Sequence, residues 1–352
     1  MRGVYIHIPF CSKICSYCDF CKMYKNDSLI KNYLKALEKE IDKYYLNDKV
    51  KTIYIGGGTP SCLSKSDLKT LFSIVKKFKL NKKYEFTFEC NINDLTEELL
   101  IFLKENKVNR LSIGVESFNE KLLNVMGRKN IDTLKKIELA KKYFSNINVD
   151  LIYGLSNETI KDLDNDLNSF MKLDVPHISI YCLIIEDNTI LKINNYEELD
   201  SDVQRTMYDR IRKILKENGY IHYEISNFCK KNYYSRHNMI YWNNEEYYGF
   251  GMGAGGFING VRYENTRSYN NFVNGNIRLD EHKLSLKEDM SNEMILGLRK
   301  INGVSKSKFY KKYNKNIKDV FDTSKLNENK RNYYISKKYL YVENSILTDF
   351  LD

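Results

Sequence analysis

The chain has 352 residues, 42% of them hydrophobic, and a formal net charge of +10. This length predicts one large domain of roughly 250 residues with an appendage, and no apolar run is long enough to span a membrane, so we expect a cytoplasmic protein without a transmembrane segment. The excess Lys is spread through an Asn-, Ile- and Tyr-rich sequence, which is typical of a solvated surface rather than of a dedicated nucleic-acid interface.

The chain begins with a short apolar strand, residues 4–8, that leads into a loop rich in cysteine. Cys11, Cys15 and Cys18 stand at a C-x3-C-x2-C spacing, which allows three thiolates to converge on one side of a tight loop and hold three corners of a cubane cluster. The fourth iron would keep an open position, as catalytic metal sites do. The alternatives are a zinc site with Cys21 as fourth ligand, although structural zinc sites usually pair two separated doublets, or a cluster of buried thiols.

Strand-like and helix-like stretches alternate after this loop. Apolar periodicity predicts helices over 28–45, 65–78, 96–106 and 160–173, one or two helices over 120–143, and strands over 51–55, 84–89, 108–115, 147–152 and 177–183. With the first strand this makes six parallel strands joined by crossovers, so we expect an α/β fold with a partial (β/α)6 TIM-like barrel. In such barrels the chemistry collects at the C-terminal ends of the strands.

A glycine-rich segment, Gly56-Gly-Gly-Thr-Pro60, follows the second predicted strand. Glycines let the backbone approach a ligand closely, and the free N–H groups with the Thr59 hydroxyl can satisfy a carboxylate or an amine. A plain turn before a helix is the alternative. The position of the segment at the expected functional rim favours binding.

Charged residues lie at or near the ends of the next strands, with Glu89 after the third, Glu116 after the fourth and Asp150 in the fifth. A carboxylate accepts hydrogen bonds from paired hydroxyls, and the guanidinium of Arg128 can fork onto a carboxylate. Each residue taken singly could be a solvated surface ion, the commoner fate of such side chains. Together, at one predicted rim, they indicate a binding site.

These motifs resemble the radical S-adenosylmethionine superfamily, and the segments Tyr5-Ile-His-Ile-Pro-Phe-Cys11 and Tyr17-Cys18-Asp-Phe resemble its branch of oxygen-independent coproporphyrinogen III oxidases and haem chaperones. The resemblance implies that Cys11, Cys15 and Cys18 hold a [4Fe-4S] cluster whose fourth iron takes the amino and carboxylate groups of S-adenosylmethionine. It also implies a set of cofactor-binding residues: Tyr5, Tyr17, Gly57, Gly58, Thr59, Glu89, Glu116, Arg128 and Asp150.

The sequence departs from the family pattern at four positions near these motifs. The family usually has Gln where Glu116 stands, Pro where Ile92 and Ser156 stand, and His where Asn130 stands. The change at Glu116 matters most, because it brings a negative charge towards a site for a cluster and a sulfonium. We expect it to tune cofactor binding.

A polar connection over 184–199 and a helix over 201–217 come next, followed by the segment His237-Asn-Met-Ile-Tyr-Trp242. This segment resembles a His-Asn-x-x-Tyr-Trp word of the same branch, which implies haem binding with His237 as a candidate axial ligand. The alternative is that His237 and Trp242 brace a loop against the barrel. The glycine run 249–256 lacks the strand-helix-strand setting of a dinucleotide site, and Gly255 stands where the family has His.

Short charged helices follow from about residue 284 and resemble the family's small C-terminal helical, winged-helix-like domain, with a hairpin expected at about 339–347. We therefore predict three parts. They are a radical S-adenosylmethionine barrel core over 1–220, a barrel extension over 221–283 that carries the His237 and glycine-rich segments, and the C-terminal domain over 284–352.

The two activities of the branch differ around the cysteine loop. The oxidases usually continue Cys-Gly-Cys after the third ligand and carry an N-terminal arm of some dozens of residues, whereas here Asp19-Phe20 follows Cys18 and ten residues precede Cys11. These features resemble the haem chaperones. The resemblance implies a protein that binds the cluster, S-adenosylmethionine and haem, and transfers haem to acceptors such as respiratory proteins, with an electron donor such as flavodoxin or ferredoxin.

Two other activities stay open from the sequence. One is a coproporphyrinogen III oxidase, which decarboxylates propionates to vinyl groups in porphyrin biosynthesis. The other is a binding or scaffold protein with a degenerate site, which the scattered motif departures allow. Whether the protein is an enzyme is therefore left to experiment.

Overall fold

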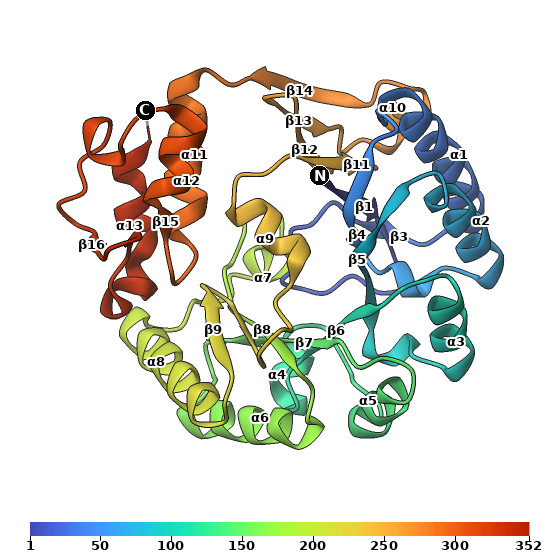
Figure 1. Ribbon diagram of the computed structural model, residues 1–352. Coiled ribbons are helices and arrows are strands. Elements are labelled where there is room, and N and C mark those ends of the chain that lie inside the picture. Colours follow the sequence, from blue (N-terminus) through green and yellow to red (C-terminus); the bar gives the residue numbers. More distant parts are fainter. Residues whose placement is uncertain (352) are drawn as a thin grey trace.

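The computed structural model describes residues 1–351. One 12-stranded mixed sheet runs in the order β14-β13-β12-β11-β1-β4-β5-β6-β7-β8-β10-β9. Figure 1 shows the sheet curving into an incomplete ring with most helices outside it. The predicted α/β partial barrel is confirmed.

The six predicted parallel strands all form, because each is an apolar or alternating stretch bounded by polar residues. Their bounds are β1 Arg2–Ile8, β4 Lys49–Gly57, β5 Lys79–Asn91, β6 Arg110–Glu116, β7 Ile147–Tyr153 and β8 His177–Cys182. Each pairs in parallel with the next in that order. Their C-terminal ends therefore meet at one rim, as the sequence predicts.

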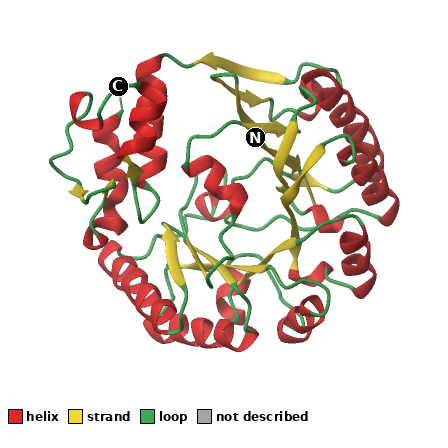
Figure 2. Ribbon diagram, in the orientation of Figure 1, coloured by secondary structure: helices red, strands yellow, loops and turns green. Residues whose placement is uncertain are grey.

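Helices connect these strands and cover the outside of the ring, as the helices drawn in red in Figure 2 show. The bounds are α1 Asp27–Tyr44, α2 Lys65–Val75, α3 Glu97–Glu105, α4 Glu120–Val125, α5 Thr133–Lys141, α6 Ile160–Leu173 and α8 Ser201–Glu217. The stretch over 120–143, predicted as one or two helices, forms two. Gly127 (φ +70°) and Asp132 (φ +53°) take left-handed backbone conformations between the two pieces, which a continuous helix cannot accommodate.

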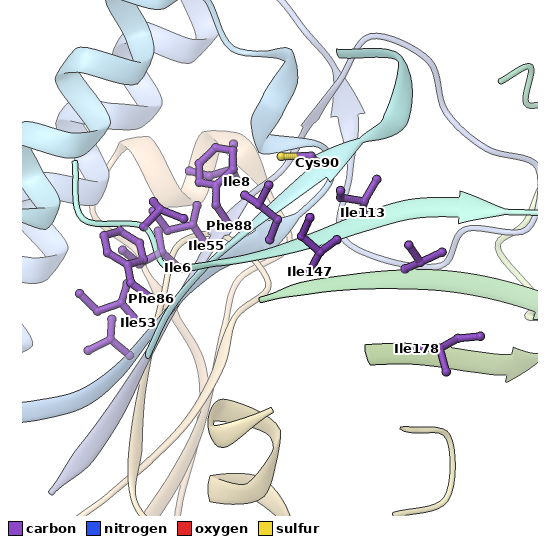
Figure 3. Packing of buried hydrophobic residues seen from close by; sticks show 14 of the residues in the cluster. Ile6, Ile8, Ile53, Ile55, Phe86, Phe88, Cys90, Ile113, Ile147 and Ile178 are labelled. Atoms are coloured by element: carbon purple, nitrogen blue, oxygen red, sulfur yellow. The ribbon is translucent and has the colours of Figure 1, made fainter. Parts of the chain in front are cut away.

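Alternation along the strands separates an apolar outer face from a polar inner face. Outward side chains such as Ile53, Ile55, Phe86 and Phe88 are at most 2% exposed and belong to the main core. Figure 3 shows them gathered against one face of the neighbouring strands. The alternate residues on the same strands are largely polar, so the interior of the ring is lined by hydrogen-bonding groups.

The segment 221–283 supplies strands to both edges of the sheet. β9 Ile221–Glu224 and β10 Asn227–Cys229 extend the β8 edge, while β11 Tyr247–Phe250, β12 Gly255–Ile258, β13 Val261–Asn265 and β14 Arg278–Lys283 extend the β1 edge. The glycine run forms β11, a turn and β12. A Cβ on Gly249 would lie 1.8 Å from the carbonyl oxygen of Gly255, so close strand packing explains this glycine.

Four short helices and strands fill connections near the rim and inside the ring. They are β2 Phe10–Cys11, β3 Met23–Tyr24, α7 Ile190–Ile193 and α9 Arg236–Trp242, and α10 Tyr269–Val273 lies beside α1. Figure 1 shows α9 near the middle of the ring, where it contacts β1 and β4.

The C-terminal segment closes the gap between the β14 and β9 edges (Figure 1). It consists of α11 Leu286–Leu298, α12 Lys306–Tyr313, α13 Glu343–Leu347 and a three-stranded sheet of β15 Val304–Ser305, β16 Asn327–Glu328 and β17 Asn332–Tyr334. The predicted hairpin at 339–347 is wrong. Residues 337–347 are helical, because Leu340, Ile346 and Leu347 share one buried face at helical spacing.

The predicted division into three parts stays a prediction. The hydrophobic core continues across the predicted boundaries. Met294 and Leu298 of α11 belong to the same buried cluster as the barrel strands. The backbone N–H of Ile301 also donates to the carbonyl of Tyr223 on β9 (3.1 Å). Within residues 1–351, no helix combines the length and apolar character needed to cross a membrane.

Candidate functional site

A pocket of about 470 Å³ opens at the C-terminal ends of the parallel strands. Residues from β4, β5, β6, β7 and β8 and from the cysteine loop line it, so the barrel rim is hollowed where the sequence motifs meet. The predicted site residues in its lining are Cys11, Cys15, Tyr17, Cys18, Gly57, Gly58, Thr59, Glu89, Glu116, Arg128 and Asp150. Tyr5 and His237 lie outside the lining.

The three spaced cysteines share one wall of the pocket. Cys11 Sγ accepts a hydrogen bond from the Thr59 hydroxyl (3.5 Å), and Cys15 Sγ accepts one from Arg128 Nη1 (3.7 Å). Burial raises the pKa of Cys11 to about 12 and also raises the pKa of Cys18. The thiols of Cys11 and Cys18 are therefore protonated in the metal-free protein, and metal binding would have to release their protons.

Cys21 does not join them. Its thiol contacts the carbonyl of Arg267 (3.9 Å), and its Cβ lies 2.5 Å from where a side chain on Gly253 would start, so it packs into the core. The zinc site with Cys21 as fourth ligand is therefore not formed. Within residues 1–351, no group of three or more His, Cys, Asp or Glu side chains is placed to hold a single metal ion.

The glycine-rich segment is shaped by what packs against it. A Cβ on Gly58 would lie 2.9 Å from Cys11 Sγ, and Gly57 takes φ +117° with the His7 ring 2.6 Å from its missing Cβ. The Gly57 N–H donates to Glu89 Oε2 (3.0 Å). The segment thus brings backbone close to Cys11 and to the Glu89 carboxylate. The N–H groups predicted to be free are engaged, because those of Gly58 and Thr59 donate to the carbonyls of Ile8 (2.8 Å) and Phe10 (2.9 Å).

Glu116 and Arg128 form a buried ion pair, with 3.2 Å between Oε1 and Nη1. Burial raises the pKa of Glu116 to about 7, the charge of Arg128 lowers it and Asp150 raises it. Arg128 Nη2 also donates to the carbonyl of Gly114 (2.7 Å), while the buried Nε has no hydrogen-bond partner. The arginine thus offsets the extra carboxylate that departs from the family pattern, and its Nε is enclosed by protein atoms.

Glu89 and Asp150 complete the floor of the pocket. The hydroxyl of Tyr54 donates to Glu89 Oε1 (2.6 Å), and Asn148 Nδ2 donates to Asp150 Oδ1 (2.8 Å). Burial raises the pKa of both carboxyls, that of Glu89 to about 7. The carboxyls in the lining, together with the Arg128 guanidinium, suit a ligand that carries cationic groups, hydroxyls and a carboxylate.

The two predicted tyrosines differ in position. Tyr17 lines the pocket, and its hydroxyl hydrogen-bonds to Glu116, which helps to lower the pKa of that carboxyl. Tyr5 lies behind the lining, where its hydroxyl pairs with His7 Nδ1 (2.9 Å) and its ring contacts Tyr54. The structure therefore brings Tyr17 to the pocket and places Tyr5 beneath it.

His237 is only 1% exposed and lies inside the ring on α9. Its Nδ1 hydrogen-bonds to Thr52 Oγ1 (2.8 Å) and its Nε2 to the Tyr241 hydroxyl (2.7 Å). Burial lowers the pKa of His237 to about 3, so the ring is neutral. With both nitrogens engaged away from the pocket, this geometry favours the brace rather than the haem ligand.

The pocket mouth and the interior contain residues that the sequence analysis did not single out. Phe20 (68% exposed), Ile184 (63%) and Tyr181 (42%) form an apolar rim. Asn148 and His177 lie on the strands below. The sequence could have indicated both residues, because each lies an even number of residues from a rim residue on the same strand. Side chains at that spacing face the same side of the sheet.

Comparison with known proteins places this geometry in context. The sequence profile described as the radical SAM superfamily matches residues 5–170. The haem chaperone HemW of Lactococcus lactis subsp. lactis is 38% identical, covering 99% of this chain and 97% of that protein. HemW of Bacillus subtilis is also 38% identical, covering 91% of this chain and 89% of its own length.

Among solved structures, coproporphyrinogen III oxidase (HemN) from Escherichia coli, described as a radical SAM enzyme, superposes with a TM-score of 0.86. The alignment covers 99% of this chain and 90% of that chain at 19% sequence identity. At this identity the similarity shows the shared fold.

Proposed function

Because this chain belongs to the radical S-adenosylmethionine superfamily, and within it to the HemW family, we propose that it is a haem chaperone. In this proposal it carries a [4Fe-4S] cluster, binds S-adenosylmethionine and haem, and passes haem to acceptor proteins. The observation that carries the proposal is one pocket in which three thiols, three carboxyls with the Arg128 guanidinium, and an exposed apolar rim meet. Full-length similarity to haem chaperones supports it.

Cys11, Cys15 and Cys18 would hold the cluster, which with S-adenosylmethionine supplies one-electron reductive chemistry when bound. Thr59 and Arg128 donate hydrogen bonds to two of these sulfurs and would stabilise them as thiolates. The electron would come from a donor such as flavodoxin or ferredoxin.

The remaining predicted contacts would orient the amino-acid and ribose parts of the cofactor. The glycine segment lets a ligand approach the backbone beside Cys11 closely, because no side chain stands there, and the Arg128 guanidinium in the pocket lining suits a carboxylate. Glu89 and Asp150 present carboxylate oxygens for amino and hydroxyl groups. Glu116 and Tyr17 lie on the same wall and set the charge that Arg128 presents.

Haem would dock at the mouth of the same pocket. Phe20, Tyr181 and Ile184 offer exposed apolar surface to a planar ring, and Lys13 and Lys22 line the same opening, where they would attract the two propionates. A free haem is apolar over its faces and anionic at one edge, so this combination of groups complements it. Acceptors such as respiratory proteins would then take haem from an exposed position.

The test is haem titration of anaerobically reconstituted protein, with and without S-adenosylmethionine. Wild type should bind haem, and the double variant Phe20→Ser with Ile184→Ser should bind it about tenfold more weakly or worse, because apolar contact area is lost. His237→Asn, which keeps a polar group near Thr52 but removes Nε2, should retain haem. Tyr24→Ser, at an exposed aromatic outside the pocket lining, serves as the matched control.

Two results would reject the proposal. One is wild type that binds no haem after reconstitution. The other is conversion of coproporphyrinogen III to a vinyl product, which would identify the oxidase alternative. If His237→Asn loses haem while the double variant Phe20→Ser with Ile184→Ser binds it fully, the haem site lies at α9 instead of the pocket mouth.

A further inference from the structure

We propose that His177 and Asn148 are positioning residues that hold the Asp150 carboxylate in the cofactor pocket and link its orientation to the start of α9. The inference rests on the proposed S-adenosylmethionine site, in which Asp150 contacts the cofactor. It concerns two side chains below the pocket that do not line it.

A continuous chain of hydrogen bonds connects these groups. The backbone N–H of Ser235, the N-cap residue of α9, donates to the Tyr223 hydroxyl oxygen (3.2 Å), and that hydroxyl pairs with His177 Nε2 (2.8 Å). His177 Nδ1 pairs with Asn148 Oδ1 (2.5 Å). Asn148 Nδ2 then donates to Asp150 Oδ1 (2.8 Å), which lines the pocket.

The donor and acceptor properties of these groups fix a single direction for the hydrogen bonds along this chain. A carboxylate accepts, so the Asn148 amide must turn its NH2 group towards Asp150 and its oxygen towards His177. His177 must then carry its proton on Nδ1, which leaves Nε2 to accept from the Tyr223 hydroxyl. The Tyr223 oxygen in turn accepts from Ser235, so each donor meets an acceptor.

Neighbouring hydroxyls reinforce this arrangement. Ser112 Oγ accepts from Asn148 Nδ2 (2.8 Å) and donates to Asp150 Oδ2 (3.2 Å), and Ser179 Oγ donates to Asn148 Oδ1 (3.1 Å). Asn148 is the direct partner of Ser112 on β6 and of His177 on β8. The arrangement is thus built from cross-strand neighbours on the inner face of the barrel.

Burial makes the arrangement specific. His177 is 0% exposed and Asn148 1%, so water does not replace either partner. Burial, followed by the nearby charge of Arg110, lowers the pKa of His177 well below its ordinary value, which keeps the ring neutral. A neutral, buried imidazole with two different partners is held in one tautomer.

The α9 end of this hydrogen-bond chain is also held in place by a buried carboxylate. The Glu85 carboxylate accepts from the backbone N–H groups of Arg236 (3.0 Å) and His237 (2.9 Å) in the first turn of α9. Ser235 directly precedes these residues and donates to the Tyr223 hydroxyl. The position of that hydroxyl therefore depends on the position of the start of α9. A displacement of α9 would therefore reach Asp150 through Tyr223, His177 and Asn148.

Removing the histidine should release the Asn148 amide. In His177→Leu its oxygen loses a buried donor, so the amide can rotate and stop donating to Asp150. His177→Asn is the conservative variant, because its amide nitrogen lies close to the original Nδ1 and can still donate to Asn148. Outer hydrogen-bond partners of a bound group typically alter affinity by about 10- to 100-fold.

Calorimetric titration of S-adenosylmethionine into anaerobically reconstituted protein tests this. We expect His177→Leu to weaken binding by about tenfold and His177→Asn to weaken it less. In an Asp150→Asn background, His177→Leu should cause no further loss, because its effect passes through Asp150. His222→Leu is the matched control, since His222 is also neutral but stacks on Phe228, and the successive side chains of His222 and Tyr223 on β9 face opposite sides of the sheet.

A second measurement does not depend on the cofactor. Nitrogen-15 NMR of labelled histidine should show His177 as the neutral Nδ1-protonated tautomer from pH 6 to 8. Four results would each overturn the inference. They are the opposite tautomer, an unchanged affinity in His177→Leu, an equal loss of affinity when His177→Leu is made in the Asp150→Asn background, and an equal loss of affinity in His222→Leu. If wild type holds its cluster but binds no S-adenosylmethionine, the proposed function fails and this inference falls with it.

Discussion

At the scale of single residues, Glu116 illustrates how a substitution can be accommodated in a buried site. Its carboxylate departs from the Gln that the family resemblance implies, yet the ion pair with Arg128 offsets the added charge. The pair also occupies part of the guanidinium that would otherwise be available to a ligand. The residue therefore lowers the charge that the guanidinium presents to a ligand.

We predict that Glu116→Gln binds S-adenosylmethionine about three- to tenfold more tightly, because the Arg128 guanidinium is no longer neutralised and offers its full charge to the ligand carboxylate. Calorimetric titration of the reconstituted protein measures the change. Glu186→Gln, which removes an exposed carboxylate at the pocket mouth, is the control and should leave the affinity unchanged. Weaker binding by Glu116→Gln would contradict the prediction.

The cysteines allow a second prediction at this scale. Cys15→Ser should lose the cluster, because it removes one of three thiols on the pocket wall, whereas Cys21→Ser should keep it, because that thiol packs against Arg267 and Gly253. Iron and sulfide content after anaerobic reconstitution, with the visible absorbance, is the measurement. Equal iron loss in both variants would show that Cys21 takes part in the site.

At the scale of elements, Glu40 links α1 to the β11–β13 edge of the sheet. Its carboxylate is 0% exposed and accepts from the Gly251 N–H (2.7 Å) and from Asn265 Nδ2 (2.7 Å). Burial raises the pKa of Glu40 from 4.5 to about 7, while those hydrogen bonds and Arg278 lower it. The folded protein thus holds this proton in a pH range where the unfolded chain has released it.

This predicts the sign of a pH effect on stability. Between about pH 4.5 and 7 the folded state binds more protons at Glu40, so its contribution to the free energy of unfolding falls as pH rises, by up to about 3 kcal/mol. In Glu40→Gln that contribution is absent. The stability of wild type relative to Glu40→Gln should therefore decrease from pH 5 to pH 8.

Urea unfolding at several pH values, without added metal, measures this difference. Glu38→Gln on the same helix is the control, because its half-exposed side chain pairs with Lys77 at the surface. A difference between wild type and Glu40→Gln that stays constant from pH 5 to 8 would rule out the proposed titration.

At the scale of the whole molecule, the C-terminal segment packs against the barrel and shares its hydrophobic core. Met290, Met294 and Leu298 of α11 lie in the main core, and backbone hydrogen bonds join Ile225 and Tyr223 near β9 to this segment. Figure 1 shows it between the two free edges of the sheet. It therefore covers the β9 edge, where Glu224 forms a bridge with Lys300, whereas β14 stays largely exposed.

We predict that a chain ending at residue 283 aggregates or unfolds without cooperativity, because it exposes the core face that α11 covers and the β9 edge of the sheet. Gel filtration and near-ultraviolet circular dichroism of this truncated chain and the full chain provide the measurement. Tyr310→Ala on an exposed position of α12 is the control and should leave the full chain intact. A monomeric, cooperatively folded truncation would support the predicted boundary at 284 as a domain boundary.

The sequence by itself determined the repeating strand and helix units, the cysteine loop and the rim on which the polar motifs meet. These features depend on periodicity and on residues close together in the chain, and the structure places the six parallel strands where the patterns predict them. The cysteine spacing likewise identifies three thiols that do share one wall of a pocket.

Only the tertiary structure decided which way individual side chains face and what they meet. It directs Cys21 into the core, pairs Glu116 with Arg128, engages both nitrogens of His237 and makes residues 343–347 helical. These outcomes depend on contacts between residues far apart in the chain, such as Thr52 with His237. Local patterns carry no information on such pairs, because burial and hydrogen bonding are settled when the strands and α9 close around one interior.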